Sequence, residues 1–538
     1  MGSGVLALIL LAFLPAILAQ NVEDVVLFVK TTETVAQTDA NYICATIDWW
    51  PEDKCNYNQC PWGSSSVLNL DLSNPLLANA IRAFKNLRLR LGGSLQDQVH
   101  YDVGNLNSCL PFVKQKGGLF GFSKGCLHMK RWDELNTFFR KTGAIVTFGL
   151  NALYGRHQGK RGVWQGNWDS SNAQDFINYT ISKGYHIDSW EFGNELSGKG
   201  IGASVSAEQY GKDVTKLNSM MDELYRKFHP RPLVVAPGGF YDKNWYAKLL
   251  EISGPHVVDV VTHHIYNLGA GIDHNLVSKI LNPYYLSKIS DIFSSLNKTI
   301  QMNGPWASAW VGEAGGAFNS GGKNVSDTFI NSFWYLDQLG MAAKYNTKVY
   351  CRQTLIGANY ALLDTNSFVP NPDYYSALLW HRLMGEGVLA IESAEPYLRS
   401  YAHCSKGREG VTLLLINLSN QTEFRVDIQS VARWGMLIEE KTNSKKHSFA
   451  HRLKKTVSWI GKKSGDVNLL REEYHLSPKD GDLQSKNMLL NGNVLELMEG
   501  GSIASLSPSL VNVKSPISIG PLSIKFIALR NFNAPACR

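Results

Sequence analysis

Eight short runs rich in apolar and β-branched residues recur along the first two thirds of this 538-residue chain. They lie at 42–50, 87–93, 144–151, 188–195, 232–238, 257–266, 309–315 and 349–357. Stretches with the spacing of amphipathic helices separate several of them, at 132–141, 173–183, 207–228, 276–296 and 327–345. Strand and helix alternation repeated eight times is typical of one α/β architecture. We therefore predict a (β/α)8 (TIM) barrel over residues 41–385.

The pattern changes after about residue 386, where short alternating runs are separated by Gly, Asn and Ser-Pro. These runs lie at 411–418, 424–428, 457–460, 494–497 and 524–529. Alternation of this kind predicts a second, smaller antiparallel β-sandwich domain over 386–538. Residues 25–35 alternate in the same way, so we predict that segment 20–40 adds an N-terminal strand to the sandwich.

An apolar stretch from Val5 to Ala19, followed by Gln20, is typical of a cleaved secretory signal peptide covering residues 1–19. It is shorter than the roughly 20 residues that cross a bilayer, and no later segment predicts a transmembrane helix. Because the usual positive charge at its start is missing, an uncleaved anchor is the alternative. We expect a secreted protein of the extracellular space or cell wall, with a vacuolar or lysosomal compartment or peripheral membrane association as alternatives.

Secretion predicts glycans and disulfides. Asn-x-Ser/Thr triplets, the acceptor sequence for N-linked glycans, begin at Asn178, Asn297, Asn324, Asn417 and Asn420. Eight cysteines allow two or three bridges in an oxidising compartment, and the pairs we expect are Cys55 with Cys60, Cys109 with Cys126, and Cys404 with Cys537. Cys44 and Cys351 lie inside apolar runs, and we predict that both are buried free thiols.

Charge and motif spacing exclude several classes of protein. The 53 basic and 46 acidic side chains give a formal net charge of +7. This charge suits an anionic substrate but is too dispersed to indicate binding of nucleic acid. No Cys-x-x-Cys or His-x-x-x-His spacing indicates a metal site, so we expect an enzyme that needs no metal or cofactor.

Two of the eight runs end with a single carboxylate. The fourth run ends in WEFGNE at Glu195, and the seventh contains WVGEAGG with Glu313. In a (β/α)8 barrel the catalytic groups come from the C-terminal ends of the strands, so both carboxylates should meet there. A pair of carboxylates is the minimal machinery for breaking a glycosidic bond. Either glutamate alone is more often a solvated rim residue or a salt-bridge partner.

The residues just before Glu195 extend this interpretation. Asn194 carries an amide suited to the 2-hydroxyl of a sugar, a contact that strengthens in the transition state. The alternative is a turn-forming asparagine after Gly193. Glu191 shares a strand face with Glu195 but lies deeper in the barrel, and we assign it a structural role.

In this order the motifs resemble the heparanase-like proteins of glycoside hydrolase family 79, and most closely the plant β-glucuronidase type. The resemblance covers almost the whole mature chain and rests on ATID at 45–48, LGG at 91–93, WEFGNE at 190–195, THHIY at 262–266, GE at 312–313, GG at 321–322, GANY at 357–360, and Cys404 with Cys537. It implies a retaining mechanism, with Glu195 as acid and then base and Glu313 as nucleophile. Retaining enzymes hold the two carboxyl groups about 5 to 5.5 Å apart, whereas about 8 Å would indicate inversion.

The resemblance also implies a binding site for a glucuronate-like sugar. It assigns Gly321, Gly322 and Tyr360 to the sugar carboxylate, because glycine amides can approach an anion closely and a tyrosine hydroxyl donates one further bond. Asp48, at the end of the first run, resembles a residue that binds sugar hydroxyls.

Electrostatics predicts how the two glutamates divide the chemistry. Glu195 has to start protonated, so burial and the charge of Glu313 should raise its pKa. Glu313 has to stay ionised, and Tyr266 is suited to donate to it, with packing at the top of the barrel as the alternative. We assign His263 and His264 to orientation or packing and neither to general-base catalysis.

Two departures from animal heparanase narrow the substrate. The excisable linker is replaced by a short segment at 105–128, and residues 237–245 carry only Lys243 where basic clusters flank the animal cleft. We therefore predict an exo-β-glucuronidase that removes glucuronate or 4-O-methyl-glucuronate from cell-wall arabinogalactan glycans or from glucuronide conjugates. The alternatives are an endo-acting heparanase-like glycosidase, a neutral exo-glycosidase, and a catalytically weak carbohydrate-binding member of the family.

Overall fold

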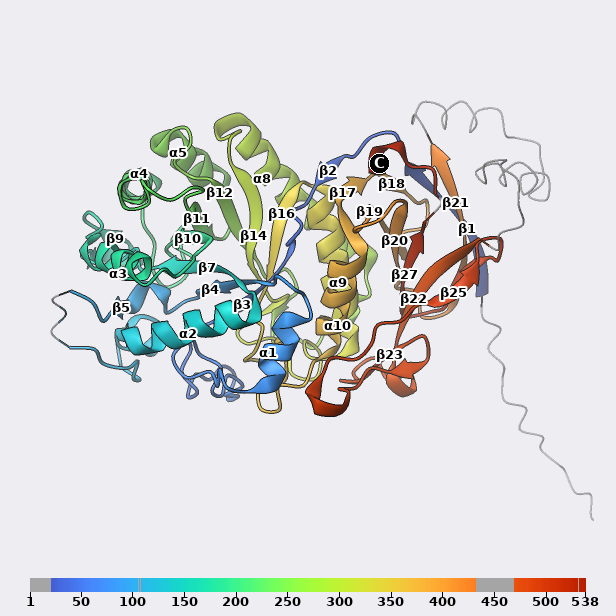
Figure 1. Ribbon diagram of the computed structural model, residues 1–538, viewed down its shortest axis with the longest axis horizontal. Coiled ribbons are helices and arrows are strands. Elements are labelled where there is room, and N and C mark those ends of the chain that lie inside the picture. Colours follow the sequence, from blue (N-terminus) through green and yellow to red (C-terminus); the bar gives the residue numbers. More distant parts are fainter. Residues whose placement is uncertain (1–20, 105, 107, 432–468, 531) are drawn as a thin grey trace, which may run out of the picture.

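The computed structural model describes residues 21–538 apart from 105, 107, 432–468 and 531. The predicted signal peptide and the predicted strand at 457–460 lie outside the described residues. Within the part of the chain that is described, no helix is long and apolar enough to span a membrane. Figure 1 shows a barrel beside a layered β structure that contains the C-terminal end of the chain.

Eight parallel strands close into a barrel, and each overlaps one of the eight predicted runs. They are β3 (Ile43–Ile47), β4 (Arg88–Leu91), β7 (Ile145–Leu150), β10 (Ser189–Phe192), β11 (Leu233–Gly239), β12 (Val260–Ile265), β14 (Ser308–Ala314) and β16 (Thr347–Arg352). Nearly all their residues are buried, because helices cover the outside of the barrel and side chains fill the inside. The predicted (β/α)8 barrel is confirmed.

Helices form the outer layer of the barrel (Figure 1). They include α1 (Pro75–Arg82), α2 (Met129–Thr142), α3 (Ser171–Ser182), α4 (Ala207–Leu224), α5 (Lys243–Ser253), α6 (Leu276–Ile280), α7 (Pro283–Ser287), α8 (Ser290–Asn303), α9 (Phe329–Lys344) and α10 (Pro372–Leu383). The segment 276–296, predicted as one helix, is divided among α6, α7 and α8. Pro283 has no N–H to donate, and Oδ1 of Asn282 accepts from the N–H groups of Tyr284 and Tyr285 at 3.0 Å, so a new helix begins there.

Two β-sheets pack face to face in the second part of the molecule. The smaller sheet has the order β18 (Ile391–Glu392), β1 (Asn21–Lys30), β21 (Thr422–Val431) and β26 (Ile517–Ile519). The larger contains β2 (Ala36–Gln37), β17 (Met384–Leu389), β19 (Leu398–Ser405), β20 (Val411–Asn417), β27 (Ser523–Leu529), β22 (Leu470–Pro478), β23 (Met488–Leu490), β24 (Asn493–Val494) and β25 (Ser509–Asn512). An apolar core that includes Leu27, Leu413, Phe424 and Ile527 fills the space between them. The predicted β-sandwich is confirmed.

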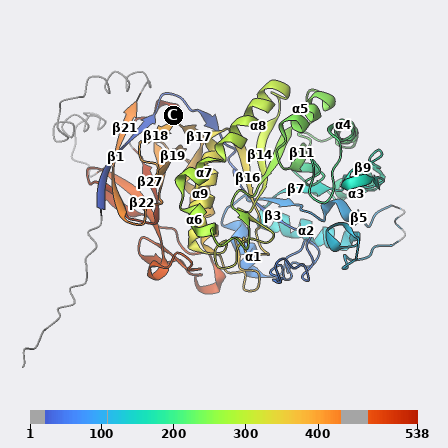
Figure 2. The ribbon, with the colours of Figure 1, turned by 180° about the vertical axis from the view of Figure 1, so that it is seen from behind.

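The N-terminal strand β1 lies inside the smaller sheet, between β18 and β21. Its residues pair in parallel with β21 along the whole strand, from Asn21 opposite Thr422 to Lys30 opposite Val431. Figure 2 shows β1 and β21 together on the side of the sandwich away from the barrel. In sequence, the entire barrel is therefore inserted between two strands that are neighbours in space.

Helices α9 and α10 lie between the barrel and the larger sheet (Figure 1), and α9 is seen in the same place from behind (Figure 2). A side chain at Gly340 in α9 would lie 2.3 Å from the ring of Tyr401 in β19, so helix and sheet are in direct contact. The buried carboxylate of Asp337 accepts hydrogen bonds from the hydroxyl of Tyr401 at 2.5 Å and from Nε of Arg399 at 2.7 Å. These contacts join the barrel and the sandwich through one continuous core.

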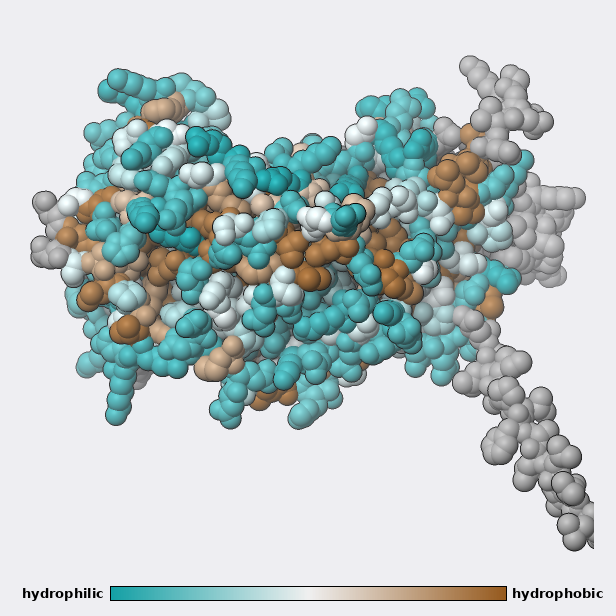
Figure 3. Space-filling view, turned by 60° about the horizontal axis from the view of Figure 1, so that its bottom comes forward, coloured by the Kyte–Doolittle hydropathy of each residue, from teal (hydrophilic) through white to brown (hydrophobic). Residues whose placement is uncertain are grey.

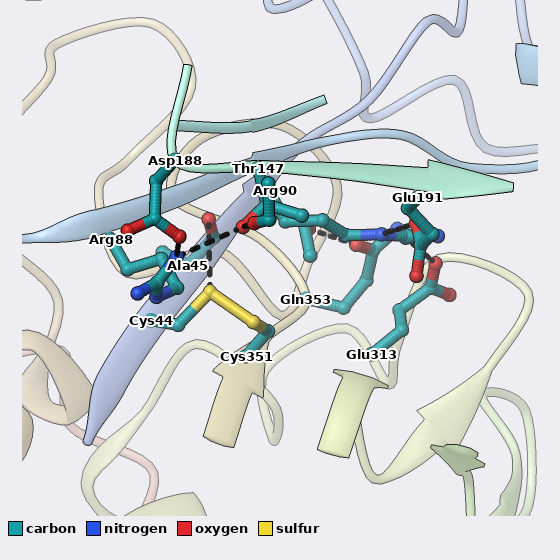
Figure 4. Close-up of a disulfide and its surroundings, with 12 residues drawn as sticks. Cys44, Ala45, Arg88, Arg90, Thr147, Asp188, Glu191, Glu313, Cys351 and Gln353 are labelled. Atoms are coloured by element: carbon teal, nitrogen blue, oxygen red, sulfur yellow. Dashed lines mark hydrogen bonds and ion pairs between the residues drawn. A yellow bond between two sulfur atoms is a disulfide. The ribbon is translucent and has the colours of Figure 1, made fainter. Parts of the chain in front are cut away.

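All eight cysteines form disulfides in the described part of the chain. Three are the expected pairs, Cys55–Cys60, Cys109–Cys126 and Cys404–Cys537. The prediction of free thiols at Cys44 and Cys351 is wrong, because these residues are bonded to each other. They lie directly opposite one another in β3 and β16, the first and last barrel strands, which become neighbours only when the barrel closes. Figure 4 shows this disulfide beside strand residues of the barrel interior.

The five glycosylation triplets differ in how accessible their asparagines are. Asn178, Asn324 and Asn420 are exposed, and Asn297 is half-buried. Asn417 is fully buried at the end of β20, and its Nδ2 donates to the carbonyls of Thr422, Ile519 and Gly520. Since a glycan is attached through this same nitrogen, the structure contradicts the predicted glycosylation of Asn417.

Candidate active site

The C-terminal strand ends of the barrel carry the two glutamates that the sequence singles out. Glu313 lies in β14, and Glu195 follows the end of β10 by three residues. Glu313 is 6% exposed and Glu195 is 7% exposed. One oxygen of each carboxylate and one ring nitrogen of His264 all lie within 4.8 Å of one another. The fourth and seventh barrel strands therefore bring both carboxylates into one buried site.

Arg90 in β4 lies at the centre of this site and is 1% exposed. Its Nε donates to Glu191 at 2.7 Å, its Nη1 to Glu313 at 2.7 Å, and its Nη2 to Oδ1 of Asn194 at 2.8 Å. A guanidinium is planar with its donors fixed in direction, so this one side chain sets the relative positions of three acceptors. Its ion pair with Glu191 accords with the structural role assigned to that glutamate.

Glu195 is held by its backbone as well as by its side chain. Its φ is +55°, and its N–H donates to the carbonyl of Gly238 at 2.6 Å. A non-glycine residue in this conformation costs on the order of 1 kcal/mol, and such strain is concentrated at functional sites. Burial raises the pKa of Glu195 to about 7, while the charge of Arg90 opposes the increase. Burial is therefore the cause of the raised pKa. The charge of Glu313, which the sequence analysis expected to contribute, is not among the causes.

Glu313 accepts two hydrogen bonds, one at each oxygen. Nη1 of Arg90 donates to Oε2 at 2.7 Å, and the hydroxyl of Tyr266 donates to Oε1 at 2.5 Å. Burial, followed by the charge of Glu313, raises the pKa of Tyr266 well above its ordinary value, so the phenol keeps the proton that it donates. A cation and a neutral hydroxyl therefore fix the direction of both Glu313 oxygens.

Asn194 presents a free amide donor toward the site. Its Oδ1 is occupied by Arg90, and its Nδ2 is buried without a hydrogen-bond partner among the described residues. The backbone N–H of Asn194 donates to Asp97 at 2.8 Å, and the same carboxylate accepts from the N–H of Ala152 at 2.7 Å. Asp97, which the sequence analysis did not identify, thus fixes the loop that carries Asn194 and Glu195. A buried unpaired donor at this position is suited to a hydroxyl of a bound sugar.

Asp48 lies at the end of β3 and is 2% exposed. Its carboxylate accepts from the N–H of Trp49 at 2.7 Å and from Nε2 of Gln353 at 2.9 Å. Gly93 has to be glycine here, because its φ is +124° and a Cβ would lie 2.4 Å from an oxygen of Asp48. Burial, and then the charge of Glu313, raises the pKa of Asp48 to about 7.

Comparison with known proteins assigns this chain to a family. Residues 24–340 match the family model for the N-terminal domain of glycosyl hydrolase family 79. The chain belongs to glycosyl hydrolase family 79. This family 79 chain is 62% identical over 523 residues to heparanase-like protein 1 of Arabidopsis thaliana, covering 97% of this chain and 96% of that protein. It is 40% identical over 513 residues to baicalin-beta-D-glucuronidase of Scutellaria baicalensis, covering 92% of this chain and 90% of that protein.

Solved structures agree with the architecture of this glycosyl hydrolase. A 4-O-alpha-L-rhamnosyl-beta-D-glucuronidase from Fusarium oxysporum 12S superposes with a TM-score of 0.60 at 14% identity, covering 93% of this chain and 100% of that one. A GH51 arabinofuranosidase from Xanthomonas axonopodis pv. citri gives 0.63 at 12% identity, covering 94% and 100%. At these identities the likeness shows the shared fold alone.

The proposed carboxylate-binding residues of this family 79 enzyme are not equivalent. Tyr360 is 4% exposed, and its ring centroid lies 6.5 Å from that of Tyr266, which donates to Glu313. Burial, followed by the charges of Glu313 and Asp48, raises the pKa of Tyr360 well above its ordinary value. Gly321 packs against it, since a Cβ there would lie 2.9 Å from the Tyr360 ring. The N–H of Gly322, however, donates to Oγ of Ser326 at 2.9 Å. The loop turns back on itself at Gly322, so this amide does not fit the predicted role.

The sequence analysis also did not predict the contact that His264 makes in the family 79 site. Its Nδ1 lies 3.0 Å from Oε1 of Glu195. Burial lowers the pKa of His264 to about 3, and that of His263 likewise to about 3, so both are neutral near pH 7. A neutral imidazole can orient the Glu195 carboxyl without adding a charge, which is an orienting role rather than that of a general base.

Proposed function

We propose that this family 79 enzyme is a retaining exo-β-glucuronidase. Its substrates would be glucuronate or 4-O-methyl-glucuronate linked to cell-wall arabinogalactan glycans or to small-molecule conjugates. The observation that carries the proposal is the carboxylate pair, whose nearest oxygens lie within 4.8 Å while Arg90 and Tyr266 fix Glu313. A close pair of this kind suits direct attack by one carboxylate, whereas an inverting enzyme holds its two carboxyl groups about 6.5 to 9.5 Å apart to admit a water.

In the first step, Glu313 attacks the anomeric carbon while the proton of Glu195 passes to the glycosidic oxygen. The bond to the leaving group breaks, and the sugar becomes an ester of Glu313. Burial favours this division, because it raises the pKa of Glu195 to about 7 and so keeps a large fraction protonated near neutral pH. Arg90 and Tyr266 each hold one of the Glu313 oxygens and so aim the carboxylate at the site.

In the second step, Glu195 is the carboxylate that removes a proton from water. The resulting hydroxide equivalent attacks the anomeric carbon, the ester to Glu313 breaks, and the sugar leaves with its original anomeric configuration. The free Nδ2 of Asn194 is suited to the sugar 2-hydroxyl in both transition states. Because Arg90 holds Glu313 and Asn194 together, the nucleophile and this donor stay in register through both steps.

The proposed preference for a uronic acid rests on Tyr360, on Gly321 and on one plant relative. The Tyr360 ring lies 6.5 Å from that of Tyr266, which donates to Glu313, and Gly321 packs against Tyr360. A hydroxyl with a neighbouring glycine amide suits a sugar carboxylate. The 40% identical plant relative bears the name of a β-D-glucuronidase. We further propose that the enzyme is secreted and carries glycans at Asn178, Asn297, Asn324 and Asn420. An endo-acting heparanase-like glycosidase stays the second candidate, on the basis of the family alone.

The first experiment measures hydrolysis of 4-nitrophenyl β-glucuronide by the wild type and by Glu313→Gln. We expect the variant to lose at least about 10³-fold in kcat, because an amide cannot form the glycosyl ester. Glu251→Gln, a change at an exposed glutamate in α5, is the matched control and should retain full activity. Equal rates for Glu313→Gln and the wild type would exclude Glu313 as the nucleophile. The corresponding β-glucoside tests the uronic preference, and NMR of the first-formed anomer tests retention.

A further inference from the structure

Two apolar side chains next to Glu195 are exposed although the catalytic groups are buried. Phe240, which follows β11, is 38% exposed, and Ile201 is 44% exposed. Single exposed apolar residues are common and need no explanation. These two differ because both lie on chain segments that contact Glu195, the proposed proton donor to the leaving group. Figure 3 shows apolar side chains gathered in a band across the face that turns the lower side of Figure 1 toward the viewer.

The backbone at Phe240 is fixed against the loop that carries Glu195. A Cβ on the preceding Gly239 would lie 2.4 Å from Oγ of Ser197 and 3.3 Å from Cα of Glu195, so the two segments are in tight contact. Oγ of Ser197 donates to the carbonyl of Phe240 at 2.9 Å. The hydroxyl of Tyr246 donates to the carbonyl of Gly239 at 2.8 Å. The position of Phe240 is therefore set by the catalytic loop itself.

The Phe240 ring lies against residues that contact both catalytic carboxylates. Its centroid is 6.3 Å from that of His264, whose Nδ1 lies 3.0 Å from Glu195. It is also 6.3 Å from the ring of Tyr266, which donates to Glu313. The aromatic face is thus held beside the catalytic pair and still reaches solvent.

Ile201 lies next to the same glutamate through the main chain. Its N–H donates to the carbonyl of Glu195 at 3.0 Å, which closes the turn after β10. The leaving-group oxygen has to come within hydrogen-bond reach of the Glu195 carboxyl, about 3 Å. Whatever is attached to that oxygen therefore comes close to the Phe240 ring and to the chain segment that carries Ile201.

We propose that Phe240 and Ile201 form the aglycone-binding platform, and that the preferred aglycone is planar and aromatic. Ring stacking and burial of apolar area favour an aromatic group, whereas the hydroxyls of a neutral sugar would find no hydrogen-bond partner on these two side chains. The inference rests on the proposed function and sharpens it, because it favours glucuronide conjugates of aromatic molecules over a galactan as the substrate class.

The test compares kcat/KM for 4-nitrophenyl β-glucuronide and for a β-glucuronosyl-galactose disaccharide. In Phe240→Ala we expect the ratio of the aromatic to the disaccharide value to fall about 10-fold, since loss of a stacked aromatic pair and its buried area removes binding to the aromatic group only. Phe240→Tyr should retain the ratio. Phe228→Ala is the matched control, because Phe228 is 48% exposed and lies between α4 and β11 at the opposite end of the barrel.

Equal losses for both substrates would overturn the proposal and leave Phe240 as a support of the catalytic loop. A larger loss for the disaccharide would show that the platform serves a sugar. Thermal unfolding checks that Phe240→Ala is folded, and Phe240→Leu replaces it if it is not. If the wild type hydrolyses neither glucuronide, the proposed function fails separately. Calorimetry then tests the platform by binding alone. We expect 4-nitrophenyl β-glucuronide to bind about 10-fold tighter than methyl β-glucuronide, and Phe240→Ala to remove this difference. Equal binding of the two glucuronides to the wild type would overturn the proposal.

Discussion

Arg88 and Arg90 lie two residues apart on β4, both buried, yet they serve different ends of the barrel. Arg88 pairs with Asp188, donates to the hydroxyl of Thr147 and lies over the Trp310 ring at 4.6 Å. Figure 4 shows Arg88 near the Cys44–Cys351 disulfide and the Glu191 and Glu313 carboxylates at the other side of the view.

The difference lies in what each guanidinium contacts. The side chain of Asp188, the partner of Arg88, is 28% exposed, whereas the side chains of Glu191 and Glu313, the partners of Arg90, are only 1% and 7% exposed. Solvent weakens the first pair, and burial strengthens the second. The comparison teaches that residue type and strand face do not decide the role of a barrel arginine. The position of the arginine along the strand decides its role, because residues at the N-terminal end of a barrel support stability and residues at the C-terminal end support the chemistry.

The sharpest test of this comparison is the same substitution at both arginines. We expect Arg90→Lys to lower kcat on 4-nitrophenyl β-glucuronide by about 10³-fold, because an ammonium cannot hold three acceptors in one plane. Arg88→Lys should change kcat less than about threefold and lower the free energy of unfolding by about 1 kcal/mol. Similar losses of kcat in both variants would show that the whole strand, not its C-terminal end, supports the chemistry.

The disulfide beside Arg88 offers a second test, now of stability. Replacing Cys44 and Cys351 together by Ala releases a loop of 307 residues, whereas replacing Cys109 and Cys126 releases one of 17. The loop-entropy model predicts a destabilisation about 2 to 3 kcal/mol larger for the first pair. Urea unfolding of the two double variants measures it. Loss of kcat in the first, under conditions where it is folded, would contradict our placement of this disulfide outside the catalytic layer.

The third test concerns the protonation of Glu195. Because the proposed mechanism requires the acid form, kcat/KM should fall about tenfold per pH unit above roughly pH 7, where burial places the pKa of this carboxyl. The folded-state pKa is raised from the ordinary 4.5, so the associated stability is fully present below pH 4.5 and is lost as the pH rises through 7. Glu195→Gln should therefore gain stability relative to the wild type over this window, by up to about 3 kcal/mol. A pH-independent difference would contradict the raised pKa.

The sequence predicted the barrel well for a physical reason. Strands buried on both faces are continuous apolar runs, and each of the eight runs in this chain overlaps a barrel strand. Glu195, Glu313 and Asn194 could be identified because they interrupt or end such runs. The local sequence also indicates that a helix ends before Pro283, although we predicted one continuous helix over 276–296.

What could not be predicted depends on contacts between distant strands. Cys44 and Cys351 look like separate core residues until the barrel closes and makes them direct neighbours. Arg90 looks like one more residue of an alternating strand, and its three acceptors come from two other strands and a loop. The left-handed backbone of Glu195 and the turn that occupies the Gly322 amide are likewise set by surroundings, not by local sequence.

The parallel pairing of β1 with β21 has a consequence for the order in which this protein is made. Residues 21–30 leave the ribosome first among the described strands, but their partner at 422–431 follows only about 400 residues later. At roughly 5 to 20 residues per second, that delay is about 20 to 80 s. During this time the strand has an unpaired edge, which is the type of surface that chaperones cover. Synthesis therefore gives the barrel time to form before β1 meets its partner strand.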